Sequence, residues 1–360
     1  MAATIGRGEW GTSESTFQRR GGKGNLRVLG NVLRVDSHPM AATCPRCFTA
    51  LAASAAFCPR CGMGTHFADP AAVAQPMDLA VGGRLYRVLD RVGVGSRSVV
   101  YRCQFGGHRS PGEGTFKVAR DPVSNGALAR EAEALRYLHA ADPAGQFTPF
   151  LPTVLESFGY VGAPAEPPRH ANVLRLHPDV RSPADDLYTL AEVRAVYGPG
   201  LDARHMAWIW RRLLTVLGFA HAHGVAHGAV LPVHVLIDPG DHKLVLIDWC
   251  DATLPGRPAV SAIPSVPIDY RAWVAADRFP SPAADVRLAA RCMADLLGGG
   301  DGDRPDSAVD PAVARHLDRA INAVDTNAWQ LLAEFDRLIE ALWGPRQFRP
   351  LTMPPKRHSV

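Results

Sequence analysis

The sequence lacks any apolar run near the roughly 20 residues needed to cross a bilayer, and it has no charged-then-apolar secretory pattern at its start. It also lacks a dense basic block and an internal repeat, and a formal charge of +4 over 360 residues is only a mild bias. These absences argue against a membrane protein, a nucleic-acid-binding protein and a repeat architecture. The default expectation is a cytoplasmic protein that binds neither membranes nor nucleic acids.

Large apolar side chains are scarce over residues 1–40, where Gly, Ser, Thr and Arg dominate, and this predicts a disordered basic tail. The chain as a whole is 47% hydrophobic, enough for one two-lobed domain of about 250 residues and a small module. Small polar residues, Ala and Pro fill 67–81, which we interpret as a linker. Residues 346–360 are predicted to form a C-terminal tail.

Two C-x-x-C pairs, Cys44 with Cys47 and Cys58 with Cys61, have the spacing that brings four thiolates around one tetrahedral zinc ion. Two disulfides or a redox site are the alternatives. A cytosolic compartment disfavours disulfides, and no βαβ pattern surrounds the cysteines. We therefore predict a zinc ribbon over 41–66, which is too small to fold without Zn²⁺ and could contact a protein partner.

Alternating apolar residues flank Gly93 and Gly95, which predicts two strands joined by a glycine-containing turn. An ordinary hairpin is the alternative interpretation of this lone G-x-G, whereas a strand-to-helix turn of the dinucleotide-binding kind does not fit. Apolar runs predict two further strands, over 151–160 and 172–176.

A lysine among apolar neighbours follows the glycine turn. Lys117 lies in a short predicted strand, and strong helix formers over 127–138 carry Glu131. A buried lysine needs a carboxylate, so we expect Glu131 to be its partner. Glu133 is the competing assignment and is expected to face solvent.

Two apolar runs, 235–237 and 244–247, are joined by Asp-Pro-Gly-Asp and predict a hairpin. The second run ends in Asp248, a carboxylate at the end of a buried strand, which therefore requires a cationic partner. His227 and His234 lie in the loop before the first run. Apolar residues at three- and four-residue steps predict helices over 188–196, 206–221 and 328–342.

The order of these motifs resembles that of the protein-kinase superfamily, and of bacterial kinase-like proteins in which a zinc ribbon precedes the kinase-like domain. The motifs are, in sequence order, the glycine turn, the lysine, the glutamate, the histidine loop and Asp248. The resemblance covers 82–345. It implies an α+β fold of two lobes, a small antiparallel β lobe and a larger helical lobe, with a hinge near 177–180. It also implies a cleft for ATP or ADP with Mg²⁺ or Mn²⁺, lined by Gly93, Gly95, Val100, Lys117, Glu131 and Asp248.

The chain departs from the kinase pattern in the catalytic loop. The motif H-R-D-L-x-x-x-N is replaced by HGAVLPVH, so Ala229 stands where the proton-accepting Asp is expected and His234 where the metal-binding Asn is expected. His234 is either a substitute ligand, with Asp248, of the nucleotide-associated cation or a core histidine bonded to the backbone. His227 is expected to be structural, and the resemblance assigns Asp285 to the loop backbone.

The missing loop carboxylate favours a pseudokinase, which binds nucleotide and has a regulatory or scaffolding role; Asp248, His227 and His234 are the candidates for any catalytic role. The first alternative is an active atypical ATP-dependent kinase for a protein or small molecule, using Lys117 and metal-bound Asp248. The second is a zinc-ribbon interaction module whose kinase-like domain binds nothing.

Overall fold

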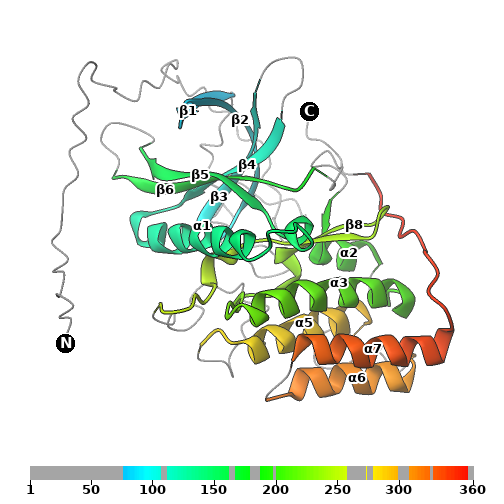
Figure 1. The fold of residues 1–360 in the computed structure, drawn as a ribbon. Coiled ribbons are helices and arrows are strands. Elements are labelled where there is room, and N and C mark those ends of the chain that lie inside the picture. The colour runs from blue at the N-terminus through cyan, green and yellow to red at the C-terminus, as the bar shows by residue number, and fades with distance from the viewer. Residues whose placement is uncertain are drawn as a thin grey trace, which may run out of the picture.

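The described part of the chain forms two lobes, a sheet above and a bundle of helices below (Figure 1). The predicted tail at 1–40 and the predicted zinc ribbon at 41–66, with its four cysteines, lie outside the described residues. No helix in the described part is long and apolar enough to cross a membrane. The computed structural model describes residues 76–106, 112–161, 167–178, 187–197, 200–257, 273, 279–298, 308–324 and 327–355.

The small lobe is an antiparallel six-stranded sheet with the strand order β1-β2-β3-β4-β6-β5. Apolar side chains at alternate positions along the strands form its core, as expected when one face of a sheet is buried. The first strand, β1, lies at the end of the segment 67–81 that we interpreted as a linker. The six strands are β1 (Met77–Val81), β2 (Arg84–Val94), β3 (Ser98–Phe105), β4 (Gly112–Ala119), β5 (Thr153–Tyr160) and β6 (Arg169–Arg175).

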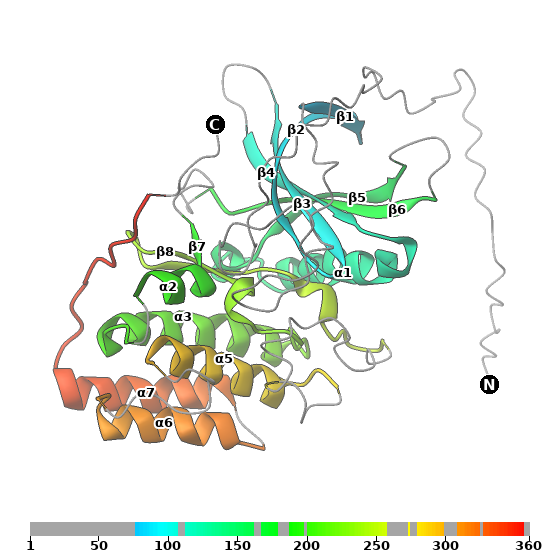
Figure 2. The same ribbon diagram turned by 180° about the vertical axis from the view of Figure 1, so that it is seen from behind.

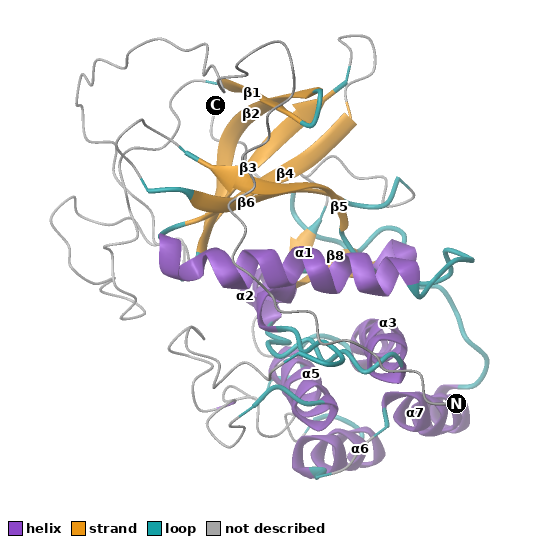
Figure 3. Cartoon of the chain, turned by 60° about the vertical axis from the view of Figure 1, so that its left-hand side comes forward, coloured by secondary structure: helices purple, strands orange, loops and turns teal. Residues whose placement is uncertain are grey.

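Helix α1 (Asn125–Ala140) lies between the sheet and the helices of the large lobe (Figure 3). A short 3-10 turn, η1 (Pro122–Ser124), leads into it, and the Asp121 carboxylate accepts a hydrogen bond from the backbone N–H of Ser124 at 2.9 Å. Near its C-terminal end, apolar residues including Leu135 join the core of the large lobe. The helix thus belongs to the packing of both lobes.

The large lobe is built around α3, which is buried along most of its length and packs against α5 and α7 (Figure 2). The helices predicted over 206–221 and 328–342 are confirmed as α3 and α7. The helices are α2 (Leu190–Tyr197), α3 (Ala203–Ala222), α5 (Pro282–Leu296), α6 (Pro311–Asn322) and α7 (Ala328–Trp343).

A small sheet, β7-β8-β9, lies at the top of the large lobe (Figure 2). The predicted hairpin is confirmed as β8 (Val235–Asp238) and β9 (Lys243–Leu246), and the Asp238 carboxylate accepts from the backbone of the turn. Short 3-10 segments elsewhere are η2 (Thr148–Phe150), η3 (Pro232–His234) and η4 (Trp249–Asp251).

The helix predicted over 188–196 begins later than expected, because β7 (Tyr188–Thr189) occupies its first residues and pairs with β8. Thr189 and Glu192 form a reciprocal capping box. The backbone N–H of Thr189 donates to the Glu192 carboxylate at 2.7 Å, and the backbone N–H of Glu192 donates to the Thr189 hydroxyl at 3.1 Å. This T-x-x-E signature fixes the start of α2 at Leu190.

The chain after α7 packs back along the large lobe instead of leaving it. Residues 344–355, which we call the C-terminal strap, climb from the end of α7 toward β7 (Figure 2). Leu351 is only 3% exposed, and the Tyr188 hydroxyl donates to the backbone carbonyl of Pro354 at 2.8 Å. Part of the predicted tail 346–360 is therefore integral to the packed domain.

Candidate nucleotide site

One row of residues crosses the sheet at the level of the site. Gly93 lies opposite Val100, Val100 opposite Lys117, and Lys117 opposite Asn172 in adjacent antiparallel strands. Residues that lie directly opposite each other in this way share a face of the sheet. Lys117 and Asn172 both contact α1, so the row faces that helix. The register thereby places Gly93 and Val100 beside the lysine, as the sequence predicts.

Lys117 is the centre of the site. Its ammonium donates to Glu131 Oε1 at 2.7 Å and to Asp248 Oδ1 at 2.9 Å, and lies 3.4 Å from the Cys250 sulfur. The Lys117 and Glu131 side chains are 6% and 1% exposed, whereas 31% of the Asp248 side chain is exposed. Residues from β4, α1 and the end of β9 therefore converge on one cation, and the Lys117–Glu131 prediction is confirmed.

The charged groups of this cluster shift one another's pKa values. Burial disfavours the charged lysine, but Asp248, Cys250 and Glu131 outweigh it and hold the pKa of Lys117 well above its usual range. Burial raises the pKa of Glu131, while the Lys117 ammonium overcomes the effect of burial on Asp248 and lowers the pKa of that carboxyl group. Glu131, Asp248 and Cys250 are close enough to hold a metal ion, but the Lys117 ammonium already contacts all three, so we assign their centre to this ammonium.

Sequence reasoning missed Asn172, which supports the cluster from β6. The Asn172 amide donates to Glu131 Oε2 at 3.1 Å and to the backbone carbonyl of Leu128 at 2.9 Å, and the residue is fully buried. The available signal was a polar amide at the start of the predicted strand 172–176, since a buried polar group requires a partner. With one oxygen on Lys117 and the other on Asn172, the Glu131 carboxylate is fixed in orientation.

Asp248 is held in a left-handed backbone conformation, with φ 64° and ψ 63°, at the junction of β9 and η4. Only short polar side chains tolerate this region readily, and the conformation costs roughly 1–2 kcal/mol. It turns the two carboxylate oxygens to different partners. Oδ1 meets Lys117, and Oδ2 lies 3.3 Å from Nε2 of His234.

Of the two expectations stated for His234, the structure shows the bond to the backbone. Its Nδ1 lies 2.8 Å from the carbonyl oxygen of Ala229, which can only accept, so Nδ1 carries a proton. Nε2 is therefore the atom that faces Asp248, and in neutral imidazole it offers a lone pair. The ring is at once anchored to the backbone and able to act as a ligand.

His227 is structural, as expected. Its Nε2 lies 3.0 Å from the Ile247 carbonyl oxygen and its Nδ1 accepts from the backbone N–H of Ala229 at 3.2 Å, which defines a neutral ring with the proton on Nε2. The ring packs edge-on against Trp249, with 4.7 Å between ring centroids. Burial, against the opposing attraction of Asp285, lowers the pKa of His227 to about 4.

We expect the stability of the protein to fall as the pH drops from about 6.5 to about 4. The His227 imidazole binds a proton near pH 6.5 in the unfolded chain but only near pH 4 in the folded protein. Its contribution to the free energy of unfolding is therefore fully present above about pH 6.5 and decreases by roughly 3 kcal/mol as the pH falls to about 4. His316, whose pKa burial also lowers to about 4, acts in the same window. Urea unfolding at pH 7, 6 and 5 should show a shallower pH slope for His227→Gln, and an unchanged slope would contradict the assignment.

Asp285 secures the loop from α5, as the resemblance implies. Its carboxylate accepts from the backbone N–H of His227 at 2.7 Å and of Gly228 at 2.8 Å, and it lies 2.9 Å from Nε2 of His221. Gly228 has φ 86°, and a Cβ on it would stand 2.5 Å from the carbonyl oxygen of Asp251. The arginine of the kinase motif therefore has no room here, and this loop backbone is built around glycine.

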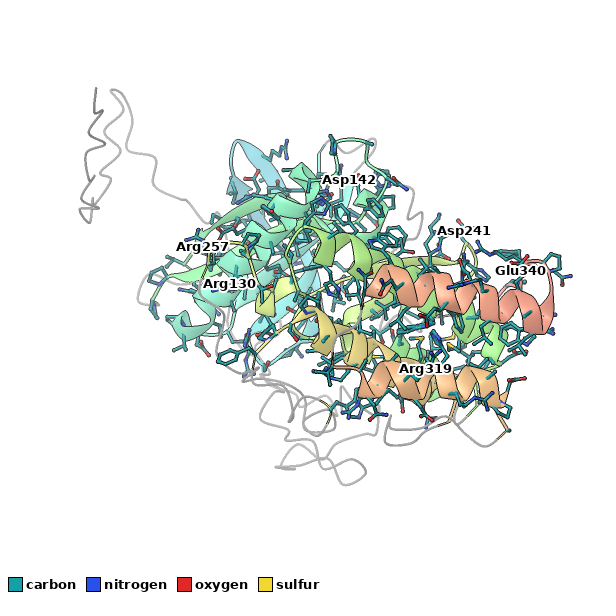
Figure 4. The ribbon with its side chains drawn as sticks, turned by 60° about the horizontal axis from the view of Figure 1, so that its bottom comes forward. Arg130, Asp142, Asp241, Arg257, Arg319 and Glu340 are labelled. Atoms are coloured by element: carbon teal, nitrogen blue, oxygen red, sulfur yellow. The ribbon has the colours of Figure 1, made fainter. Side chains whose placement is uncertain are left out.

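Two further expectations concern the edges of the site. Glu133 faces solvent, as predicted, and pairs with Arg257 at 2.6 Å. Arg130 on α1 donates to the backbone carbonyl of Ala252 at 3.5 Å, so α1 contacts the segment after η4. Figure 4 shows Arg130 and Arg257 on the same side of the molecule. Of the predicted hinge at 177–180, only residues 177 and 178 are described.

Comparison with known proteins supports the fold without assigning a family. No protein-family model and no curated protein matches the sequence. By contrast, 1723 chains of solved structures match the fold. Among them is the crystal structure of the BubR1 kinase domain, with 15% sequence identity and a TM-score of 0.52, a match that covers 73% of this chain and 83% of that one. The chain therefore has a protein-kinase-like fold.

Proposed function

From this kinase-like fold we propose that the protein binds ATP or ADP without efficient phosphoryl transfer and acts as a regulatory or scaffolding pseudokinase. The observation that carries the proposal is the buried ammonium of Lys117 between Glu131 and Asp248, at 2.7 and 2.9 Å. The three N–H donors of this ammonium meet Glu131, Asp248 and the Cys250 sulfur, so a phosphate oxygen would replace one of them, most readily the sulfur at 3.4 Å. The loop has Ala229 where a carboxylate would accept a substrate proton, and that absence argues against efficient transfer.

The residues beside Lys117 fit a divalent cation that accompanies the nucleotide. Asp248 Oδ2 and Nε2 of His234 are 3.3 Å apart and belong to side chains that are 31% and 18% exposed. Carboxylate oxygen suits magnesium and manganese, while imidazole suits manganese better than magnesium. Such an ion would supply charge neutralisation for the phosphates, and the ligand set supports Mn²⁺ over Mg²⁺.

An active atypical kinase is the second candidate, and the placement of His234 against Asp248 is the observation that favours it. Phosphoryl transfer depends mainly on positioning and charge neutralisation, and a positioned base typically contributes roughly 10²–10⁴-fold in rate. Transfer from labelled ATP that Asp248→Ala abolishes would establish this candidate. The absence of transfer with any divalent metal would eliminate it.

Gly93 offers a way to block nucleotide binding without damaging the fold. Apart from Gly93 itself and its two neighbours in the sequence, no atom of the described residues lies within 4 Å of the place where its Cβ would stand, so packing does not require glycine there. The same holds for Gly159 in β5, which serves as the matched control.

ATP with Mn²⁺ is expected to raise the melting temperature of the protein by about 5 °C at a ligand concentration near 100 times Kd. Gly93→Val should leave the melting temperature of the free protein unchanged and lose most of the ATP-induced shift. The valine side chain would occupy the space that the nucleotide needs on the Lys117 side of the sheet. Gly159→Val should retain the shift. If neither Mg²⁺ nor Mn²⁺ with ATP shifts the wild type, the zinc-ribbon interaction module, with an unidentified protein partner, becomes the better explanation.

A further inference from the structure

An arginine on the glycine-containing turn reaches the other lobe. Arg97 Nη1 lies 2.8 Å from Asp251 Oδ1, and the two side chains are only 15% and 11% exposed. Arg97 belongs to the turn between β2 and β3, while Asp251 ends η4 in the large lobe. This ion pair therefore joins the two lobes beside Asp248.

The turn that presents Arg97 is braced by the backbone. The N–H of Gly95 donates to the carbonyl of Ser98 at 2.8 Å, and the N–H of Arg120 donates to the carbonyl of Arg97 at 2.9 Å. The backbone of the arginine is thus fixed, while its long side chain can change partner by rotation about side-chain bonds alone.

The charges around this pair leave the site short of cations. Lys117 and Arg97 face three carboxylates, those of Glu131, Asp248 and Asp251. Burial raises the pKa of Asp251, with Arg97 opposing and Asp248 adding to the shift. A nucleotide that brings several more negative charges needs every cation in reach, and the guanidinium is the group best shaped to bind phosphate oxygens in pairs.

We propose that Arg97 is a phosphate-binding residue of the nucleotide site and that Asp251 holds it when no nucleotide is bound. This inference rests on the proposed function, since it names the partner that Arg97 exchanges for Asp251. A phosphate carries more charge than a carboxylate and competes for the same guanidinium donors. Asp251 is then a competitor of the nucleotide, and it lowers the apparent affinity by the fraction of time that it keeps the arginine.

The proposal predicts opposite effects from the two members of one ion pair. Arg97→Ala should weaken binding of ATP with Mn²⁺ by about tenfold, because a charge-assisted contact with phosphate is lost. Asp251→Asn should tighten ATP binding by up to about tenfold, because the competitor has lost its charge. Adenosine has no phosphate, so its affinity should be the same in all variants. A purely structural ion pair would instead affect ATP and adenosine alike.

Isothermal titration calorimetry of the full chain with Mn²⁺–ATP and with adenosine tests this, with Arg257→Ala and Glu133→Gln as controls. The Arg257–Glu133 pair also links α1 to the segment after η4, but it is exposed, with side chains 58% and 46% accessible. Its variants make the same changes in net charge, and both should bind ATP as the wild type does. Arg97→Lys should bind ATP with an affinity between those of the wild type and Arg97→Ala. If Asp251→Asn does not fold, this variant tests whether the guanidinium binds phosphate.

Two results would overturn the inference in distinguishable ways. If the wild type binds ATP and the Arg97 and Asp251 variants bind it equally well, the proposed function stands and the role of Arg97 is refuted. If the wild type gives a flat titration with ATP, the proposed function fails and the inference fails with it. Parallel changes for ATP and adenosine would assign the ion pair to lobe packing alone.

Discussion

Replacing Lys117 with methionine is expected to destabilise the protein by about 3–5 kcal/mol, because it leaves carboxylates without their buried cation. Glu131 is almost fully buried and has Asn172 as its other side-chain partner, so it cannot regain the lost interaction from water. Methionine keeps the length and much of the volume of the lysine, so the cost reports charge more than cavity formation. Urea unfolding at pH 7 measures it.

A double-mutant cycle distinguishes this charge effect from general damage. Lys117→Met with Glu131→Gln removes one buried charge of each sign, so the double variant should recover part of the stability that the single lysine variant loses. A cost below about 1 kcal/mol for Lys117→Met, typical of exposed pairs, would contradict the burial of this cluster. Additive effects of the two substitutions would show that Lys117 and Glu131 are not energetically coupled.

Replacing Asp285 with alanine should cost a similar amount, about 3–4 kcal/mol, although the residue touches no expected ligand. Its two oxygens accept the backbone N–H groups of His227 and Gly228, and each buried donor left unsatisfied costs about 1–3 kcal/mol. The loop that carries His234 would lose its attachment to α5. Loss of the proposed nucleotide binding should therefore accompany the loss of stability.

An exposed aspartate provides the comparison for Asp285. Asp241 lies on the turn between β8 and β9, pairs with Lys243 at 2.7 Å and has 59% of its side chain exposed (Figure 4). Asp241→Ala should change the free energy of unfolding by less than about 1 kcal/mol, as is usual for exposed ion pairs. Equal costs at the two positions would contradict the structural role of Asp285.

The parts of the site that could be predicted from sequence share one physical reason. Lys117 and Asp248 are charged residues in or at the end of apolar strands, and such residues demand partners whatever the fold. Together with the order of the motifs, this was sufficient to pair Lys117 with Glu131 and to place Asp248 in the same cleft. The hairpin of β8 and β9 was predictable because its turn residues are local signals.

The parts that could not be predicted depend on contacts between distant segments without a repeating pattern. The Arg97–Asp251 pair has no signal in either segment alone, because an arginine in a turn and an aspartate after a strand are both ordinary surface residues. Asn172 could be suspected only as a polar residue at the start of the predicted strand 172–176. The left-handed backbone at Asp248 follows from the surrounding packing, and the predicted zinc ribbon at 41–66 remains a prediction.

The C-terminal strap sets a boundary for any shortened form of the protein. A polypeptide that stopped at the end of α7 would uncover the surface on which Leu351 is buried, and would deprive Tyr188 of its hydrogen bond to Pro354. Tyr188 belongs to β7, which pairs with the hairpin that delivers Asp248. Cleavage by a carboxypeptidase, or a tag fused before Leu351, would therefore loosen the hairpin that positions Asp248.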